Sequence, residues 1–201
     1  MWHPQGWEPM KLPYKELPGF SKNLLADHYK LYTGYIKRLK KVYELVDQLP
    51  DKPDRNEFQR LVLEEGFLVN AIRLHELYFG QLTPKGAGEA GDILGELTDD
   101  YLEDLTLAAM GSTGWAILAV DIAHAVPGVF TMKDHSQGYV AESWPILVVD
   151  AYEHAYMREY GLDKEAYLQS FFVNVDWNVV AERTKQGLAM AEIAASEARV
   201  R

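Results

Sequence analysis

The spacing of apolar residues in the first half of the chain predicts two long amphipathic helices. Ser21 is a plausible N-cap for a helix that runs to about Val46, and a second helix covers about 56–82. The turn LPDKPDRN separates the two helices, which predicts an antiparallel helical hairpin. The apolar positions that recur mostly at intervals of three and four are Leu24, Leu25, Tyr32, Tyr35, Ile36, Leu39, Tyr43 and Val46 in the first helix, and Phe58, Leu61, Phe67, Leu68, Ile72, Leu74 and Leu77 in the second.

Segments rich in proline or glycine lie on both sides of this hairpin. Residues 1 to about 20 contain four prolines, which prevent a helix and favour an extended arm. The glycine-rich segment TPKGAGEAGD (83–92) is typical of a linker between domains. We therefore expect an N-terminal domain of arm and hairpin over residues 1–88, and a C-terminal domain over residues 89–201.

The pattern changes in the second half of the chain. A third helix is predicted over roughly 93–110, and helical patterns return in EHAYMREYG, in KEAYLQSFF and in a final segment from Trp177 to Val200. Between them lie three short runs rich in β-forming residues and separated by turn signals, WAILAVD, AVPGVFTM and WPILVVDAY. The chain as a whole is predicted to be α+β, with an all-helical half followed by a half that contains a small sheet.

Composition and charge narrow the classes of function. Of the 201 residues, 48% are hydrophobic and 25% are charged, which is typical of a globular chain with a substantial core. The net charge of −10 argues against nonspecific binding to nucleic acid or to an anionic membrane. The chain has no cysteine, which excludes disulfides, thiolate metal sites and a cysteine nucleophile.

The N-terminal segment gives an expectation about location. It shows no basic region followed by an apolar run, and no uncharged apolar stretch in the chain approaches the ~18 residues of a membrane span. We therefore expect a cytoplasmic protein that does not bind membranes. Met1-Trp2-His3 also places a histidine third from the N-terminus, an arrangement that can bind Cu(II) or Ni(II).

Three of the six histidines, together with one aspartate, form a candidate metal site. His28 and His75 lie among apolar residues of the two long helices, and His154 follows Asp150 by four residues where an apolar run meets a helix. A single histidine of this kind is more often a hydrogen-bonded core side chain. Burying all four groups without partners would cost several kcal/mol, however, and one shared metal ion would satisfy them together. Three imidazoles and a carboxylate suit iron, manganese or zinc.

Several segments of the chain resemble one known family. The run DAYEHAYMREY (150–160), followed by AYLQSFFVNVDWNVVAER (166–183), closely resembles the C-terminal signature of the iron/manganese superoxide dismutases. The similarity extends to GSTGWAILAVD (111–121) and to both long helices, and it covers nearly the whole chain beyond about residue 18. It implies a helical hairpin followed by an α/β domain with a three-stranded antiparallel sheet, which agrees with the pattern described above.

The resemblance also implies an activity and a set of ligands. It assigns the metal ligands as His28, His75, Asp150 and His154, with one iron or manganese ion per subunit. The implied reaction converts two superoxide ions to dioxygen and hydrogen peroxide as the metal cycles between two oxidation states. Glu153 matches a glutamate that reaches across the subunit interface of the family, which implies a homodimer or homotetramer. Neither the choice of metal nor the choice of oligomer follows from the sequence.

Two residues match the surroundings of the metal in the family. Trp115 corresponds to a tryptophan that forms a wall of the active site. Many members place a glutamine near the metal, but Ala71 stands four residues before His75, so the second helix cannot supply it. At the alternative position, in KDHSQG, the matching residue is His135, as in the branch of the family that uses histidine. The other interpretation of His135 is a surface histidine in a polar turn.

The first helix departs most from the family pattern. The family usually has a histidine four residues after the first ligand and a tyrosine four residues later, where this chain has Tyr32 and Ile36. The tyrosine that usually pairs with that histidine is here Met157. Tyr35 is seven residues after His28 and lies within ~20° of it around an ideal helix. We therefore predict that Tyr35 is the tyrosine at the entrance to the site.

Two alternative functions remain open at this point. A mononuclear iron oxygenase would need two histidines and one carboxylate, and the third histidine argues against it. A catalytically weak, metal-binding relative of the family is favoured only by the altered first helix.

Overall fold

The computed structural model describes residues 6–84, 86–93, 95 and 98–198. The candidate copper site at Met1-Trp2-His3 lies outside the described residues, as does Val200, the predicted end of the last helix. The predicted α+β fold with a three-stranded antiparallel sheet is confirmed.

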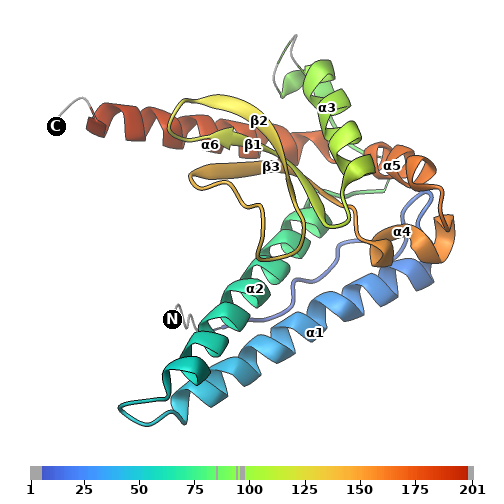
Figure 1. The fold of residues 1–201 in the computed structure, drawn as a ribbon. Coiled ribbons are helices and arrows are strands. Elements are labelled where there is room, and N and C mark those ends of the chain that lie inside the picture. Colours follow the sequence, from blue (N-terminus) through green and yellow to red (C-terminus); the bar gives the residue numbers. More distant parts are fainter. Residues whose placement is uncertain (1–5, 85, 94, 96–97, 199–201) are drawn as a thin grey trace.

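The helical hairpin is formed by α1 (Lys22–Asp47) and α2 (Arg55–Gly80), which lie side by side in Figure 1. Ser21 caps α1 as predicted, because its side chain accepts a hydrogen bond from the first turn. Asp54 caps α2 in the same way. The buried or half-buried faces include the predicted apolar positions except Phe58, which is 41% exposed in the first turn of α2, and they bring His28 and His75 to the interior.

The third helix begins later than the sequence predicts. A short 3₁₀ turn, η1 (Ala90–Asp92), precedes α3 (Thr98–Gly111). Gly95 lies between them with φ +61, a left-handed conformation that cannot continue a right-handed helix. The prediction of a continuous helix over 93–110 was therefore wrong at its start.

The sheet contains β1 (Trp115–Asp121), β2 (Val126–Met132) and β3 (Ser143–Asp150) in the order β2-β1-β3. Both pairings are antiparallel. Because β1 lies between the other two strands, it is the buried central strand, and β3 is an edge strand. Figure 1 shows α6 (Trp177–Ala198) passing behind the sheet, and the helix contacts β1 and β3. The helix comes close to the sheet at Gly187, where a Cβ would lie only 2.9 Å from the ring of Trp144.

Two short helices connect β3 to α6. They are α4 (Glu153–Tyr160) and α5 (Lys164–Val173), and α4 packs against the start of α1. An ion pair between Arg158 and Asp27 joins the two helices, and the backbone N–H of Ser21 donates to Glu159 at 2.7 Å. These contacts bring the end of β3 next to the hairpin.

The predicted arm and linker both pack against the rest of the chain. The described part of the arm is not helical, and it buries the side chains of Trp7, Tyr14, Leu17 and Phe20. In the linker, Thr83 N–H donates to the backbone oxygen of Asn174 at 2.8 Å, and Ala87 accepts from Trp177 at 2.6 Å. The segment after α2 is thus fixed to the loop before α6. The boundary between residues 88 and 89 stays a prediction.

Among the described helices, none is both long and apolar enough to cross a membrane.

Candidate metal centre

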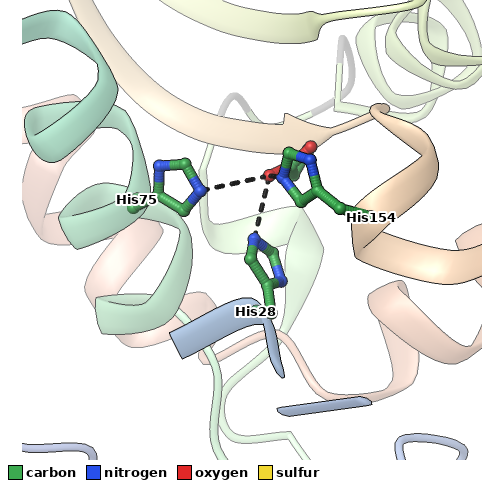
Figure 2. Close-up of side chains that lie close together, drawn as sticks. His28, His75 and His154 are labelled. Carbon is green, nitrogen blue, oxygen red and sulfur yellow. Dashed lines mark hydrogen bonds and ion pairs between the residues drawn. The ribbon is translucent and has the colours of Figure 1, made fainter. Parts of the chain in front are cut away.

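Side chains from four different elements converge at the junction between the hairpin and the sheet. His28 comes from α1, His75 from α2, Asp150 from the last position of β3, and His154 from the first turn of α4. One potential ligand atom from each residue lies within 4.8 Å of those of the other three. Figure 2 shows the three imidazole rings directed toward one point. This is the group that the sequence analysis proposed.

Asp150 is the centre of this cluster. Its Oδ2 atom lies 3.0 Å from His28 Nε2, 3.1 Å from His154 Nε2 and 3.7 Å from His75 Nε2. Its other oxygen, Oδ1, accepts the backbone N–H of Tyr152 at 3.0 Å. The carboxylate is therefore held by its own loop and directs one oxygen toward all three imidazoles.

His75 provides a test of whether a metal ion fits. Its Nδ1 atom lies 2.6 Å from the backbone oxygen of Ala71, and because a carbonyl can only accept, Nδ1 carries the proton. The lone pair of a neutral ring is then on Nε2, which is buried and has no hydrogen-bond partner among the described residues. Such an atom costs about 1–3 kcal/mol if nothing contacts it. A metal ion among the four side chains would provide the missing contact.

The surroundings of His75, His28 and Asp150 also favour the protonation states that bind a metal ion. Burial, with a smaller contribution from the neighbouring His28, lowers the pKa of His75 to about 3. Burial likewise lowers the pKa of His28, although Asp150 partly opposes this effect. Burial by itself would raise the pKa of Asp150, but the charges and hydrogen bonds of His154 and His28 outweigh it, so the pKa is well below its usual range. Neutral imidazoles and an ionised carboxylate are the forms that bind metals.

His154 differs from the other two histidines. It is partly exposed, with 28% of its side-chain surface accessible. Burial lowers its pKa, but the negative charge of Asp150 outweighs this effect and the pKa is raised. His154 Nε2 lies 3.1 Å from the carboxylate of Asp150, and a metal ion bound between them would displace any proton held on His154.

A second layer of side chains lies beside the cluster. Trp115 Nε1 donates to His135 Nδ1 at 2.9 Å, and His135 Nε2 lies 3.3 Å from the hydroxyl oxygen of Tyr35. Burial lowers the pKa of His135 to about 4, so the ring is neutral at pH 7. Because Nδ1 accepts from an indole N–H, the single ring proton is on Nε2, and it is donated to Tyr35. The hydroxyl proton of Tyr35 is left free for another acceptor.

The structure brings all three predicted surrounding residues together. The ring of His135 lies 6.0 Å from that of His75, and the ring of Tyr35 lies 5.5 Å from the same imidazole. Trp115 packs edge-on against His75 at 5.1 Å. His135 is only 1% exposed, so the alternative of a surface histidine in a turn was wrong. Its backbone oxygen accepts a hydrogen bond from Asn70 at 2.7 Å.

The hydroxyl of Tyr32 takes no part in the hydrogen bonds of this second layer, although its ring stacks on that of His75 at 6.1 Å. Tyr32 is fully buried, and its hydroxyl accepts the backbone N–H of Met10 at 2.9 Å and donates to Glu76 at 3.1 Å. The residue that replaces the usual histidine of the family thus binds the N-terminal arm to α2. The hydroxyls of Tyr32 and Tyr35 have separate partners, because that of Tyr35 contacts His135 while that of Tyr32 contacts the arm and Glu76.

An open hollow lies on the outer side of His154. It has a volume of about 690 Å³, and its lining includes Tyr152, Glu153 and Leu162. The ring of Tyr152 stacks on that of His154 at 5.1 Å. Glu153 is exposed at the start of α4, and Leu162 is 90% exposed. The cluster therefore approaches the molecular surface at this hollow.

The sequence analysis missed several polar residues that support the site. Asn70 binds the backbone of His135, Glu76 binds Tyr32, and Gln81 binds the backbone of β3. Each lies on or next to α2, and the apolar spacing that defines this helix gives no signal for them. Only the place of Asn70, Glu76 and Gln81 close to His75 in the sequence could have drawn attention to them.

Comparisons with known proteins agree with this arrangement. Residues 96–183 match the family model described as "Iron/manganese superoxide dismutases, C-terminal domain". The chain is similar to "Superoxide dismutase [Fe]" of Aquifex pyrophilus, with 33% identity over an alignment of 192 residues that covers 89% of this chain and 90% of the relative. The protein of the same description from Aquifex aeolicus also shares 33% identity, over 89% of this chain and 90% of the relative. "Superoxide dismutase [Mn]" of Haloarcula marismortui is 28% identical over 92% of this chain and 95% of the relative.

Proposed function

Because the chain belongs to the iron/manganese superoxide dismutase family, we propose that it converts superoxide to dioxygen and hydrogen peroxide at one iron or manganese ion per subunit. The ligands would be His28, His75, Asp150 and His154. The observation that carries this proposal is the convergence of these four side chains within 4.8 Å, including the buried and unpartnered Nε2 atom of His75. Relatives described as iron and as manganese enzymes both match the chain, so either metal is compatible with it.

The bound metal ion would supply the one-electron redox chemistry of both half-reactions. The residues of the chain hold the ligand set and limit access to it. Trp115 and Tyr152 cover the imidazoles of His75 and His154, so bulky molecules are kept away from them.

We assign the delivery of protons to Tyr35. The reduction of superoxide to hydrogen peroxide consumes two protons, and a positioned hydroxyl next to the ligands can supply one of them. His135 donates its Nε2 proton to the oxygen of Tyr35, and Trp115 fixes this orientation of the imidazole ring. The hydroxyl proton of Tyr35 is therefore available to the reacting oxygen.

We further propose a homo-oligomer with Glu153 at the interface between subunits. Support comes from the exposed position of Glu153 next to His154, and from exposed apolar side chains such as Leu162 and Met110 in the lining of the same hollow. Sedimentation equilibrium on the wild type and on Glu153→Ala tests this proposal, and a monomeric wild type would contradict it. The predicted cytoplasmic location stays a prediction that cell fractionation can test.

The direct test of the activity is stopped-flow measurement of superoxide decay. The protein is first freed of loosely bound metal, and its content of iron, manganese and copper is measured. We expect rapid decay that scales with the iron or manganese content. Full occupancy by iron or manganese without faster superoxide decay would refute the dismutase activity and favour a metal-binding relative of the family. The replacement of the family's usual histidine by Tyr32 would then explain the loss of activity.

A further inference from the structure

Two polar side chains join the helix that carries His75 to the strand that carries Asp150. Since β3 is an edge strand, part of its backbone has no neighbouring strand to bind. At Val148 the side chain of Gln81 binds the backbone groups that a neighbouring strand would otherwise bind. Val148 N–H donates to Gln81 Oε1 at 3.1 Å, and Gln81 Nε2 donates to the carbonyl oxygen of Val148. Gln81 is completely buried at the C-terminal end of α2.

Arg183 of α6 fixes this amide in one orientation. Its Nη1 atom donates to Gln81 Oε1 at 3.0 Å, and its Nη2 atom donates to the backbone oxygen of Leu77 at 3.0 Å. Leu77 supplies one of the last carbonyl groups of α2, which have no partner within the helix. Burial lowers the pKa of Arg183 to about 10, so the guanidinium stays charged at pH 7. Because it can only donate, the amide oxygen of Gln81 must face it, and the amide nitrogen faces Val148.

The two candidate ligands on these elements, His75 and Asp150, each form a hydrogen bond within their own part of the chain. His75 donates Nδ1–H to Ala71 within α2, and Asp150 accepts from Tyr152 in the loop that follows β3. Neither bond crosses between the helix and the strand. The separation of the His75 and Asp150 side chains therefore depends on how α2 and β3 are joined, and Gln81 and Arg183 provide polar bonds at this junction.

We propose that Gln81 and Arg183 are positioning residues that set the separation between His75 and Asp150, and thereby the affinity of the site for its metal ion. This inference rests on the metal centre proposed above. Gln81 follows His75 by six residues, or about 1.7 helical turns, and Val148 precedes Asp150 by two residues on the same strand. Loss of residues that orient metal ligands typically weakens metal binding about 10–100-fold.

The experiment compares the wild type with Gln81→Met in the full chain. Methionine retains the length of the side chain but forms neither hydrogen bond to Val148. The affinity for Fe(II) and for Mn(II) is measured by competition with a chelator, and the ferric form is examined by electron paramagnetic resonance. We expect metal binding to weaken by about tenfold or more, together with a changed ferric spectrum.

Tyr14→Phe is the matched control. It removes a hydrogen bond from the Tyr14 hydroxyl to the backbone oxygen of Phe79 at 3.1 Å, at the same end of α2, but this bond does not involve β3. We expect a lower melting temperature in this variant, with metal affinity and ferric spectrum unchanged. A purely structural role for Gln81 would give the same result in Gln81→Met.

Arg183→Lys keeps the test decisive if Gln81→Met does not fold. Lysine retains the charge but cannot contact Gln81 and Leu77 as a planar fork, so a smaller change in the same direction is expected. Wild-type affinity and spectrum in the folded variants would overturn the positioning role. A wild type that binds iron or manganese without accelerating superoxide decay would overturn the proposed activity, while the affinities would still decide this inference. A wild type that binds neither metal would overturn both.

Discussion

The two halves of the candidate metal centre are built in different ways. Asp150 and His154 are four residues apart at one strand–helix junction, and their side chains lie 3.1 Å apart. His28 and His75 come from separate long helices, and their rings meet at 5.1 Å only because those helices pack together. The first pair thus depends on local backbone geometry, whereas the second depends on the tertiary structure of the hairpin. Burial separates the three histidines in the same way, since His154 is partly exposed and both hairpin histidines are buried, but Asp150 is buried like the hairpin histidines.

The largest expected effect is that of His28→Ala in the hairpin half. We expect loss of bound metal and of dismutase activity, because one ligand is missing. We also expect the metal-free chain to lose about 3 kcal/mol of stability, because the change leaves a cavity and removes a buried hydrogen bond to Asp150. Metal analysis and urea unfolding of the metal-free protein measure the two effects. Retention of full metal content would contradict the ligand assignment.

His154→Ala should affect the metal equally but the fold less. The variant is expected to lose metal and activity, while the metal-free protein loses only about 1 kcal/mol, because the side chain is partly exposed beside an open hollow. The same two measurements apply. Equal destabilisation by His154→Ala and His28→Ala would show that the two halves of the site do not differ in the way described above.

The sequence was most informative where the geometry is local. The spacing of Asp150 and His154 places both side chains on one side of a strand–helix junction, and the apolar periodicity gave the hairpin that carries His28 and His75. The predicted start of the third helix was wrong because Gly95 adopts a left-handed conformation, which the spacing of apolar residues does not reveal.

Contacts between distant elements could not be predicted in this way. The binding of Gln81 to Val148, or of Tyr32 to Met10, joins residues far apart in the chain that share no spacing pattern. Such contacts depend on side-chain directions that are fixed only when the elements have packed. For the same reason the sequence left open whether His135 lies in a surface turn, whereas the structure buries it against Trp115.

His135→Ala tests the layer outside the ligands. The metal should remain bound, because the side chain of His135 is not in the ligand cluster. The reduction potential of the metal should change, however, and turnover should fall about tenfold or more. Redox titration and stopped-flow kinetics measure these effects. An unchanged midpoint and an unchanged rate would remove His135 from the functional surroundings of the metal.

Tyr35→Phe, in the same layer of side chains, should have a smaller effect on the reaction than His135→Ala. It removes the hydroxyl that accepts from His135 and holds the transferable proton, while the aromatic ring remains. If this group contributes about 1.4 kcal/mol to the step that consumes a proton, turnover falls about tenfold, and metal content stays unchanged. Stopped-flow kinetics in light and heavy water would detect the change. A wild-type rate would exclude Tyr35 as the proton donor.

Tyr32→Phe is expected to have the smallest effect on the reaction. The hydroxyl of Tyr32 binds Met10 and Glu76, so its removal should destabilise the protein by about 1–2 kcal/mol through release of the arm. Turnover per bound metal should stay close to that of the wild type, because the ring beside His75 is retained and the lost bonds face the arm. Thermal unfolding and stopped-flow kinetics, run in parallel with Tyr35→Phe, separate the two tyrosines. Equal slowing by both substitutions would mean that Tyr32, three residues before Tyr35 on α1, shares the proton path instead of serving the arm alone.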